Sequence, residues 1–280
     1  MNNFTHMKNL FLTILSFFCL SVSAQISHVS GGDKIVHPSS IVTIDKSNME
    51  CIYSHKTFDP KKDETKEMHY ILQIGNNFSA YNDYGGYRQD SVIKEIYPNG
   101  LKSIDLRRLS IQYQPSYHCT VKDLHNNTVT TYDRVFIDHY YYSEPTPNIK
   151  WHLEKGTREI CGYTCKKATA NFRGRDWTAW YCDIPLNNGP WKFGNLPGLI
   201  LRVEDSKGEH VFEAISLRKK SQEFGYHDFD YSKTTRKKFN EALAEYKNNP
   251  GVMVAGMVQN PDGTPKTDFK PMFFNPIELE

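Results

Sequence analysis

The chain has 280 residues, a formal net charge of +2 and 13% aromatic residues. A chain this close to neutral has no electrostatic basis for binding nucleic acid, and its length allows one large or two small domains. At its start, Lys8, the apolar run 10–20 and the small residues of Val22-Ser23-Ala24 predict a signal peptide over residues 1–24. The run is shorter than the ~20 residues of a membrane-spanning helix, and no later segment approaches that length. We therefore expect an exported protein with a single domain over residues 25–280 and no transmembrane segment after cleavage.

The rest of the chain is expected to be mainly β, because segments rich in β-branched and aromatic residues alternate with Asn, Gly and Pro turns. The expected strands, in chain order, are 49–55, 69–74, 78–81, one or two within 129–142, 149–153, 199–205 and 210–218. Residues 90–97 fit either a short helix capped by Asp90 or a strand. These patterns predict a single antiparallel β-rich domain, built as a curved sheet, a partial barrel or a sandwich, with a few helices.

One helix is expected near residues 233–248. Its apolar residues recur at helical spacing and would form one face: Phe239, Ala242, Leu243 and Tyr246. Ser232 can cap the first turn, and the turn residues from 248 to 251 end the helix. The tail from 272 to 280 is too apolar for a free end, so we expect it to dock on the body of the protein.

Residues 164–183 predict a β-hairpin. A two-residue turn at Arg173-Gly174 would place glycine where a type I′ turn needs a positive φ, and Cys165 would then lie opposite Cys182. A four-residue loop over 173–176 would instead place Cys182 opposite Lys167, and the sequence leaves both registers open. In either register one face is apolar, as expected for an antiparallel pair with one face on the core. That face consists of Ala168, Ala170, Phe172, Trp177, Ala179 and Tyr181.

Five cysteines remain after removal of the signal peptide: Cys51, Cys119, Cys161, Cys165 and Cys182. An exported protein meets an oxidising compartment, so disulfides are expected, and the odd number leaves at least one thiol single. Cys165–Cys182 is the first candidate disulfide and Cys161–Cys165 the second.

Aromatic and basic residues near the hairpin suggest a ligand-binding groove. Its candidate residues are Lys167, Arg175, Trp177, Trp180 and Trp191. The alternative interpretation is that these side chains only pack the hairpin against its neighbours, since aromatic residues bury the most area in any core.

Catalytic and metal-binding signatures are missing from the sequence. It contains no Gly-x-Ser-x-Gly elbow, no phosphate-binding glycine motif, no His-x-x-x-His and no Cys-x-x-Cys. We therefore predict no catalytic residues, no metal ligands and no cofactor, and a non-enzymatic role is favoured. The nearest approaches to a metal site are His118-Cys119 and Asp138-His139, with Met68-His69 as another.

The most distinctive stretch runs from Gly189 to Leu201, called here the signature loop. Three glycines and two prolines alternate with apolar side chains, which predicts a rigid structural corner that leads into a strand. Its signature residues are Gly189, Pro190, Asn195, Leu196, Pro197, Gly198, Leu199 and Ile200. With the hairpin motifs and the closing Asn275-Pro276-Ile277-Glu278-Leu279, this loop resembles the secreted GLPGLI family. Asn195 stands where that family usually has a glycine, and asparagine is the commonest substitute at positive φ.

The resemblance implies export from a Gram-negative, Bacteroidota-type cell and a location in the periplasm or cell envelope, with the cell exterior as an alternative. It implies no catalytic residue. We therefore expect a binding or accessory protein whose candidate partners are a small apolar ligand or an outer-membrane transport component. The alternatives are a metal-handling protein for copper or zinc, using residues such as His118 and Cys119, and a hydrolase of an unrecognised type.

Overall fold

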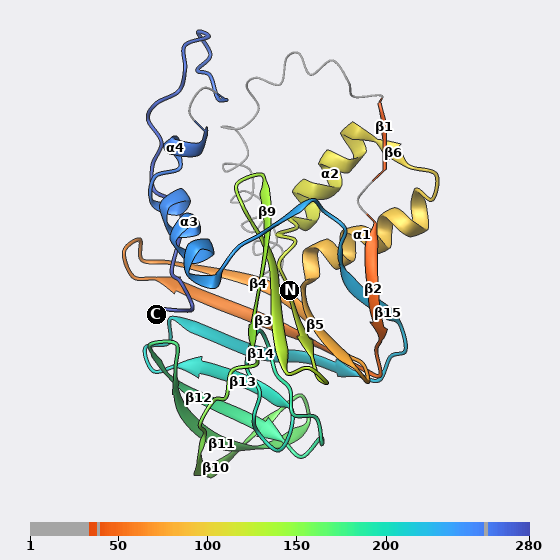
Figure 1. Cartoon of the computed structure of the whole chain (residues 1–280), viewed down its shortest axis with the longest axis vertical. Helices are drawn as coiled ribbons and strands as arrows, with labels where there is room; N and C mark the ends of the chain where they lie inside the picture. The colour runs from red at the N-terminus through yellow and green to blue at the C-terminus, as the bar shows by residue number, and fades with distance from the viewer. Residues whose placement is uncertain (1–33, 38–39, 255–256) are drawn as a thin grey trace, which may run out of the picture.

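The computed structural model describes residues 34–37, 40–254 and 257–280, so the predicted signal peptide lies outside the described residues. The fold is mainly β and is dominated by one sheet of 12 strands (Figure 1). In sheet order the strands are β10 (His152–Ile160), β11 (Tyr163–Phe172), β12 (Arg175–Cys182), β13 (Ile200–Asp205), β14 (His210–Arg218), β3 (Met49–Asp59), β4 (Glu64–Ile74), β5 (Phe78–Asp83), β7 (Cys119–Asp123), β8 (Thr128–Val135), β9 (Asp138–Pro145) and β16 (Tyr231–Lys233).

Neighbouring strands in this sheet are antiparallel except β16, which pairs in parallel with β9. The sheet does not close into a barrel: β10 and β16 are its two edges. The expectation of an antiparallel β-rich domain with a few helices is confirmed, and its form is a large open sheet.

Smaller elements lie on either side of this sheet. Two further strand pairs are β15 (Glu223–His227) with β2 (Ile41–Lys46), and β1 (Ile35–Val36) with β6 (Leu101–Lys102). The helices are α1 (Tyr84–Ile96), α2 (Ser103–Tyr113), α3 (Arg236–Asn248) and α4 (Gly251–Val254). In Figure 1, α1, α2 and the β2–β15 pair gather on the right, while α3, α4 and the C-terminal tail lie on the left.

The helix expected near 233–248 is α3, and its start differs from the sequence prediction. The Thr235 hydroxyl accepts a hydrogen bond from the Lys238 backbone N–H, which makes Thr235 the cap, whereas Ser232 belongs to β16. Residues 90–97 are mostly helical, but their helix α1 begins earlier and is capped by Asp83 rather than Asp90. In both places a side chain closer to the true first turn satisfies the free N–H groups.

The hairpin β11–β12 has the two-residue turn. Arg173 and Gly174 both have positive φ, at 55° and 75°, as a type I′ turn requires, and Cys165 pairs directly with Cys182. The apolar face of the hairpin is buried in the main core as predicted. Cys165 and Cys182 are buried as well, although they do not belong to that apolar face.

The signature loop is part of the same core. Its apolar side chains are buried: Trp191, Phe193, Leu196, Leu199, Ile200 and Leu201. Asn195 has a φ of 65°, so it takes the left-handed conformation expected at this position. Gly198 is required by a close approach, since a Cβ there would lie 1.8 Å from the Cys182 carbonyl oxygen. The loop is thus a buried corner that leads into β13.

A buried lysine from the sheet fixes this loop in place. The Lys122 ammonium on β7 donates to Asn188 Oδ1 at 2.8 Å, to the Gly189 carbonyl at 3.1 Å and to the Phe193 carbonyl at 2.5 Å. Burial lowers the pKa of Lys122 to about 7. By donating to these three oxygen atoms, Lys122 holds the signature loop against the sheet.

Candidate ligand-binding cavity

A cavity of about 630 Å³ lies between the sheet, α3 and the C-terminal tail. The sheet side, called here the floor, includes His55, Tyr70, Tyr81, Thr131, Tyr142 and Phe212. The opposite side, called here the roof, consists of α3 residues such as Phe239, Leu243 and Ala244 together with tail residues 274–280. α3 is placed there because Phe239 packs on Val135 of β8 and Tyr142 of β9.

Four polar side chains from β3, β4, the residue before β7, and β8 lie across the floor and are called here the polar row: His55, Tyr70, His118 and Asp133. The ring of Tyr70 lies 6.0 Å from the ring of His55 and 6.0 Å from the ring of His118. His118 Nδ1 is 2.7 Å from Asp133 Oδ2. The row therefore places polar groups close to one another across a floor that also contains aromatic rings.

Two members of the row, His55 and Tyr70, are uncharged near neutral pH. Burial, with a further contribution from the neighbouring His210, lowers the pKa of His55 well below its usual value. Burial raises the pKa of Tyr70, and Asp83 and Asp133 add to that effect. His55 is therefore a neutral imidazole and Tyr70 a protonated phenol, which can donate its hydroxyl hydrogen.

Both nitrogens of His118 are engaged. In the tautomer that carries its hydrogen on Nδ1, His118 donates to Asp133 Oδ2, and Nε2 accepts from the Thr120 hydroxyl at 3.0 Å. Thr120 is fully buried. The lone pair that could remove a proton from water or substrate is therefore occupied by a side chain that solvent does not reach.

Two stacked tyrosines of the floor differ in their hydroxyl groups. Tyr70 and Tyr81 stack at 4.8 Å with their planes 14° apart. The Tyr70 hydroxyl donates to Met68 Sδ at 3.8 Å, a weak acceptor. The Tyr81 hydroxyl is enclosed and has no hydrogen-bond partner in the described part of the chain. A ligand in the cavity can thus compete for the first hydroxyl and has no access to the second.

Buried ion pairs hold the tail over the cavity. The Arg175 guanidinium binds Asp205 at 2.7 Å and Glu209 at 2.7 Å, and it also donates to the carbonyl oxygens of Pro276 and Ile277. The tail is therefore a fixed part of the roof, in agreement with the expectation that it docks.

A second anchor joins the tail to the signature loop. The Lys192 ammonium lies 2.6 Å from Glu144 and 2.8 Å from Glu278. Arg236 of α3 also contacts Glu278, at 3.2 Å, so α3, the tail and the loop meet at one carboxylate.

The structure separates the five residues of the sequence-predicted groove. Of these, Trp191 contributes to the cavity. Arg175 and Trp177 are buried in the tail anchor and the core, while Lys167 pairs with Trp180 on the other face of the hairpin. Because neighbouring residues of a strand point to opposite faces, closeness in sequence did not bring these side chains to one surface.

The polar row was missed by sequence reasoning because its members come from β3, β4, the residue before β7, and β8. Only His118 was noticed, as part of the His118-Cys119 pair. The alternation of polar and apolar residues along each strand indicates which face they occupy, but the sheet order that aligns them was not derivable from the sequence.

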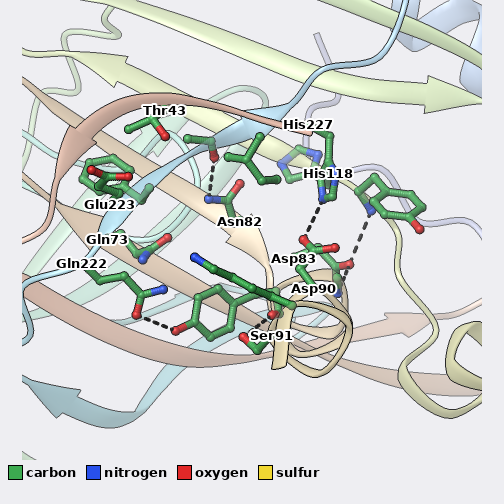
Figure 2. Close-up of a pocket in the computed structure, with 17 residues that line it drawn as sticks. Thr43, Gln73, Asn82, Asp83, Asp90, Ser91, His118, Gln222, Glu223 and His227 are labelled. Carbon is green, nitrogen blue, oxygen red and sulfur yellow. Dashed lines mark hydrogen bonds and ion pairs between the residues drawn. The ribbon is translucent and has the colours of Figure 1, made fainter. Parts of the chain in front are cut away.

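A smaller pocket of about 210 Å³ lies between α1, β5 and the β2–β15 pair. Figure 2 shows its amide and carboxylate side chains, among them Asn82, Asp83 and Asp90. Asp83 accepts from the backbone N–H groups of Gly86 and Ser116, and Asp90 lies 3.2 Å from His227. These polar groups mainly fix the helix and the adjoining loop.

The described residues contain no group of three or more His, Cys, Asp or Glu side chains arranged to hold a metal ion. None of the helices formed by the described residues is long and apolar enough to cross a membrane.

Comparison with known proteins gives only a distant likeness. No protein-family model matches the chain, and no curated protein matches it significantly. Among solved structures, PNGF-II in a C2 crystal form is similar with 16% identity and a TM-score of 0.48, over 72% of this chain and 33% of that one. PNGF-II in a P21 form gives 15% identity and a TM-score of 0.47, over 73% and 34%. The chain spans about a third of the length of those proteins, and no function follows from similarity at this level.

Proposed function

We propose that this chain is a non-enzymatic binding protein of the cell envelope that holds a small, largely apolar molecule in the cavity beneath α3. The cavity itself carries the proposal: its volume of about 630 Å³ lies within the range of small-molecule sites. Aromatic and aliphatic side chains make up much of its wall, and polar side chains from the sheet, α3 and the tail lie among them. Small-molecule sites commonly combine an apolar wall with polar groups that orient the ligand.

The cellular location in this proposal rests on the signal-like N-terminus and on the resemblance to the GLPGLI family. Export places the protein where apolar molecules need a carrier, because they are poorly soluble in the aqueous periplasm. An outer-membrane transport component is the partner to which such a carrier would deliver its ligand.

The test measures binding of the uncharged dye N-phenyl-1-naphthylamine. The variant Ala244→Trp places an indole in the cavity, whereas Lys238→Trp adds the same ring to an exposed position of the same helix. Saturable binding that Ala244→Trp weakens by at least about tenfold and Lys238→Trp leaves unchanged is the expected result. Absence of binding, or equal effects of the two variants, would show that the cavity is not a ligand site.

Hydrolysis is a second candidate, favoured by the His118–Asp133 pair, whose two titratable groups meet at 2.7 Å at the cavity wall. Non-enzymatic binding is preferred because His118 Nε2 is occupied by Thr120. Hydrolysis of p-nitrophenyl butyrate that is lost in His118→Gln would favour the hydrolase. Metal handling, the remaining alternative, gains no geometric support and is tested by elemental analysis of protein purified without chelators.

A further inference from the structure

We propose that the ligand is uncharged and carries a hydrogen-bond-accepting oxygen, such as that of a ketone or ester, which binds to the Tyr70 hydroxyl at the centre of the floor. This inference rests on the proposed binding function and specifies the class of molecule bound.

The buried carboxylates of the cavity already have hydrogen-bond or ion-pair partners. Asp133 is bound by His118, and Glu278 is bound by Lys192 and Arg236. The other charged side chains of the lining are exposed, where water solvates them: Lys237 and Glu241 on α3, and Glu280 in the tail. A charged ligand would leave water without gaining a counter-charge, which is strongly unfavourable, whereas an uncharged ligand loses little.

The central floor is neutral as well. His55 is stacked on Phe212, with ring centroids 3.8 Å apart, and its Nε2 is already in contact with His210 at 3.2 Å. A positive charge on His55 would stand beside His210, which itself lies close to Arg175, so the imidazole does not serve as a cation for an anionic ligand.

Tyr70 is the donor best placed to bind a ligand. Its present acceptor is the thioether of Met68, at 3.8 Å, and a carbonyl oxygen is a much stronger acceptor. Met68 is half exposed at the cavity wall, so a ligand can displace it without disturbing the core. The hydroxyl thereby offers a directional contact within a surface that otherwise binds through apolar area.

The adjacent Tyr81 provides a matched control within the same floor. It is the same residue type, stacked parallel to Tyr70, and its hydroxyl is enclosed and unpartnered within the described structure. Removing the Tyr70 hydroxyl should weaken binding of an accepting ligand. Removing the Tyr81 hydroxyl should leave binding unchanged.

The experiment uses two probes with the same ring system, prodan (6-propionyl-2-dimethylaminonaphthalene), which has a ketone, and 6-dimethylamino-2-naphthoate, which has a carboxylate in its place. Prodan is expected to bind at least about tenfold more tightly than the naphthoate. Tyr70→Phe is expected to weaken prodan binding by about three- to tenfold, and Tyr81→Phe to leave it unchanged. The emission wavelength of bound prodan also reports the hydrogen bond from Tyr70. Prodan emits at shorter wavelength when its carbonyl oxygen loses a hydrogen bond, so Tyr70→Phe should shift the emission of bound prodan in that direction.

The outcomes separate the two proposals. If N-phenyl-1-naphthylamine binds but the naphthoate binds as tightly as prodan, the inference about ligand class is wrong and the binding function stands. If Tyr70→Phe and Tyr81→Phe change prodan affinity equally, the Tyr70 hydroxyl does not bind the ligand, and the binding function again stands. If neither N-phenyl-1-naphthylamine nor either probe binds, the proposed function itself fails.

Discussion

At the scale of single residues, the informative positions are those where one side chain binds a backbone or charged group that is distant in the sequence. Asn195 is such a position: it has a φ of 65°, and its Oδ1 accepts from the Ile149 backbone N–H at 3.1 Å. The sequence was sufficient to expect the conformation, because asparagine tolerates positive φ. It gave no sign of the bond to Ile149, which is distant in the chain.

We predict that Asn195→Ala destabilises the protein more than Asn195→Gly. Both variants lose the hydrogen bond to Ile149, worth about 1 kcal/mol, but only alanine adds the cost of about 1–2 kcal/mol for a left-handed backbone with a Cβ. Urea unfolding of the two variants beside the wild type measures this difference. A larger loss for glycine than for alanine would mean that the loop does not hold this conformation in solution.

Lys192 gives a second prediction at this scale. Lys192→Met removes the buried ammonium from Glu144 and Glu278, although the guanidinium groups of Arg173 and Arg236 still contact both carboxylates. The variant should therefore lower the free energy of unfolding by about 1.5–3 kcal/mol. Lys166, paired with Asp183 at an exposed site, is the control, and Lys166→Met should change stability much less because water screens that pair. Denaturant midpoints distinguish the two. Similar values would contradict the assignment of Lys192 as the buried anchor of the roof.

At the scale of elements, the sequence was most informative where a periodic pattern was bounded by turn residues. The β11–β12 hairpin follows from alternation and from the turn at Arg173-Gly174. The pairing of β2 with β15 was not foreseen, because the two strands are separated by most of the chain. The helix α2 was also missed, since none of its residues is buried and its pattern of apolar residues is weak.

The hairpin register supports a prediction about its cysteines, which are unbonded in the structure. The Cys182 N–H donates to Leu199, away from β11, so Cys165 and Cys182 form a non-hydrogen-bonded pair. The Cα atoms of such pairs lie about 4.5 Å apart, within the range that a disulfide spans. We predict that protein recovered from an oxidising compartment contains the Cys165–Cys182 bond.

Intact mass and peptide mapping with and without reductant test this bond. The expected result is a loss of two hydrogen atoms in mass and a linked peptide pair that disappears on reduction. Cys119, buried in a separate cluster, should remain a free thiol and serves as the internal control. A linked peptide containing Cys161 in place of Cys182 would identify the alternative pairing.

At the scale of the whole molecule, the candidate site exists because one open sheet brings distant strands side by side and the chain returns to cover it. Local patterns predicted a β-rich fold, the helix α3 and a docked tail. They could not predict that α3 and the tail would enclose a cavity with His55, Tyr70 and Asp133, because that requires the order of twelve strands. The cavity residues are thus individually ordinary in sequence and become a site only through topology.

The same topology makes stability sensitive to acid, because His55 and His210 are buried together beneath the tail. Burial, reinforced by Arg175, lowers the pKa of His210 to about 4, whereas an unfolded histidine titrates near 6.5. Between those values the unfolded state binds a proton that the folded state does not, so stability falls as pH decreases from about 6.5 to 4. The shift corresponds to about 3 kcal/mol from His210.

Urea unfolding at a series of pH values from 7 to about 4 measures this loss. His210→Gln keeps a polar side chain that does not titrate, and it should therefore remove part of the pH dependence while His55 maintains the rest. His152→Gln, at an exposed position on β10, should leave the pH dependence unchanged. If His210→Gln and the wild type lose stability equally over this range, the acid sensitivity arises elsewhere, in the carboxylates that anchor the tail.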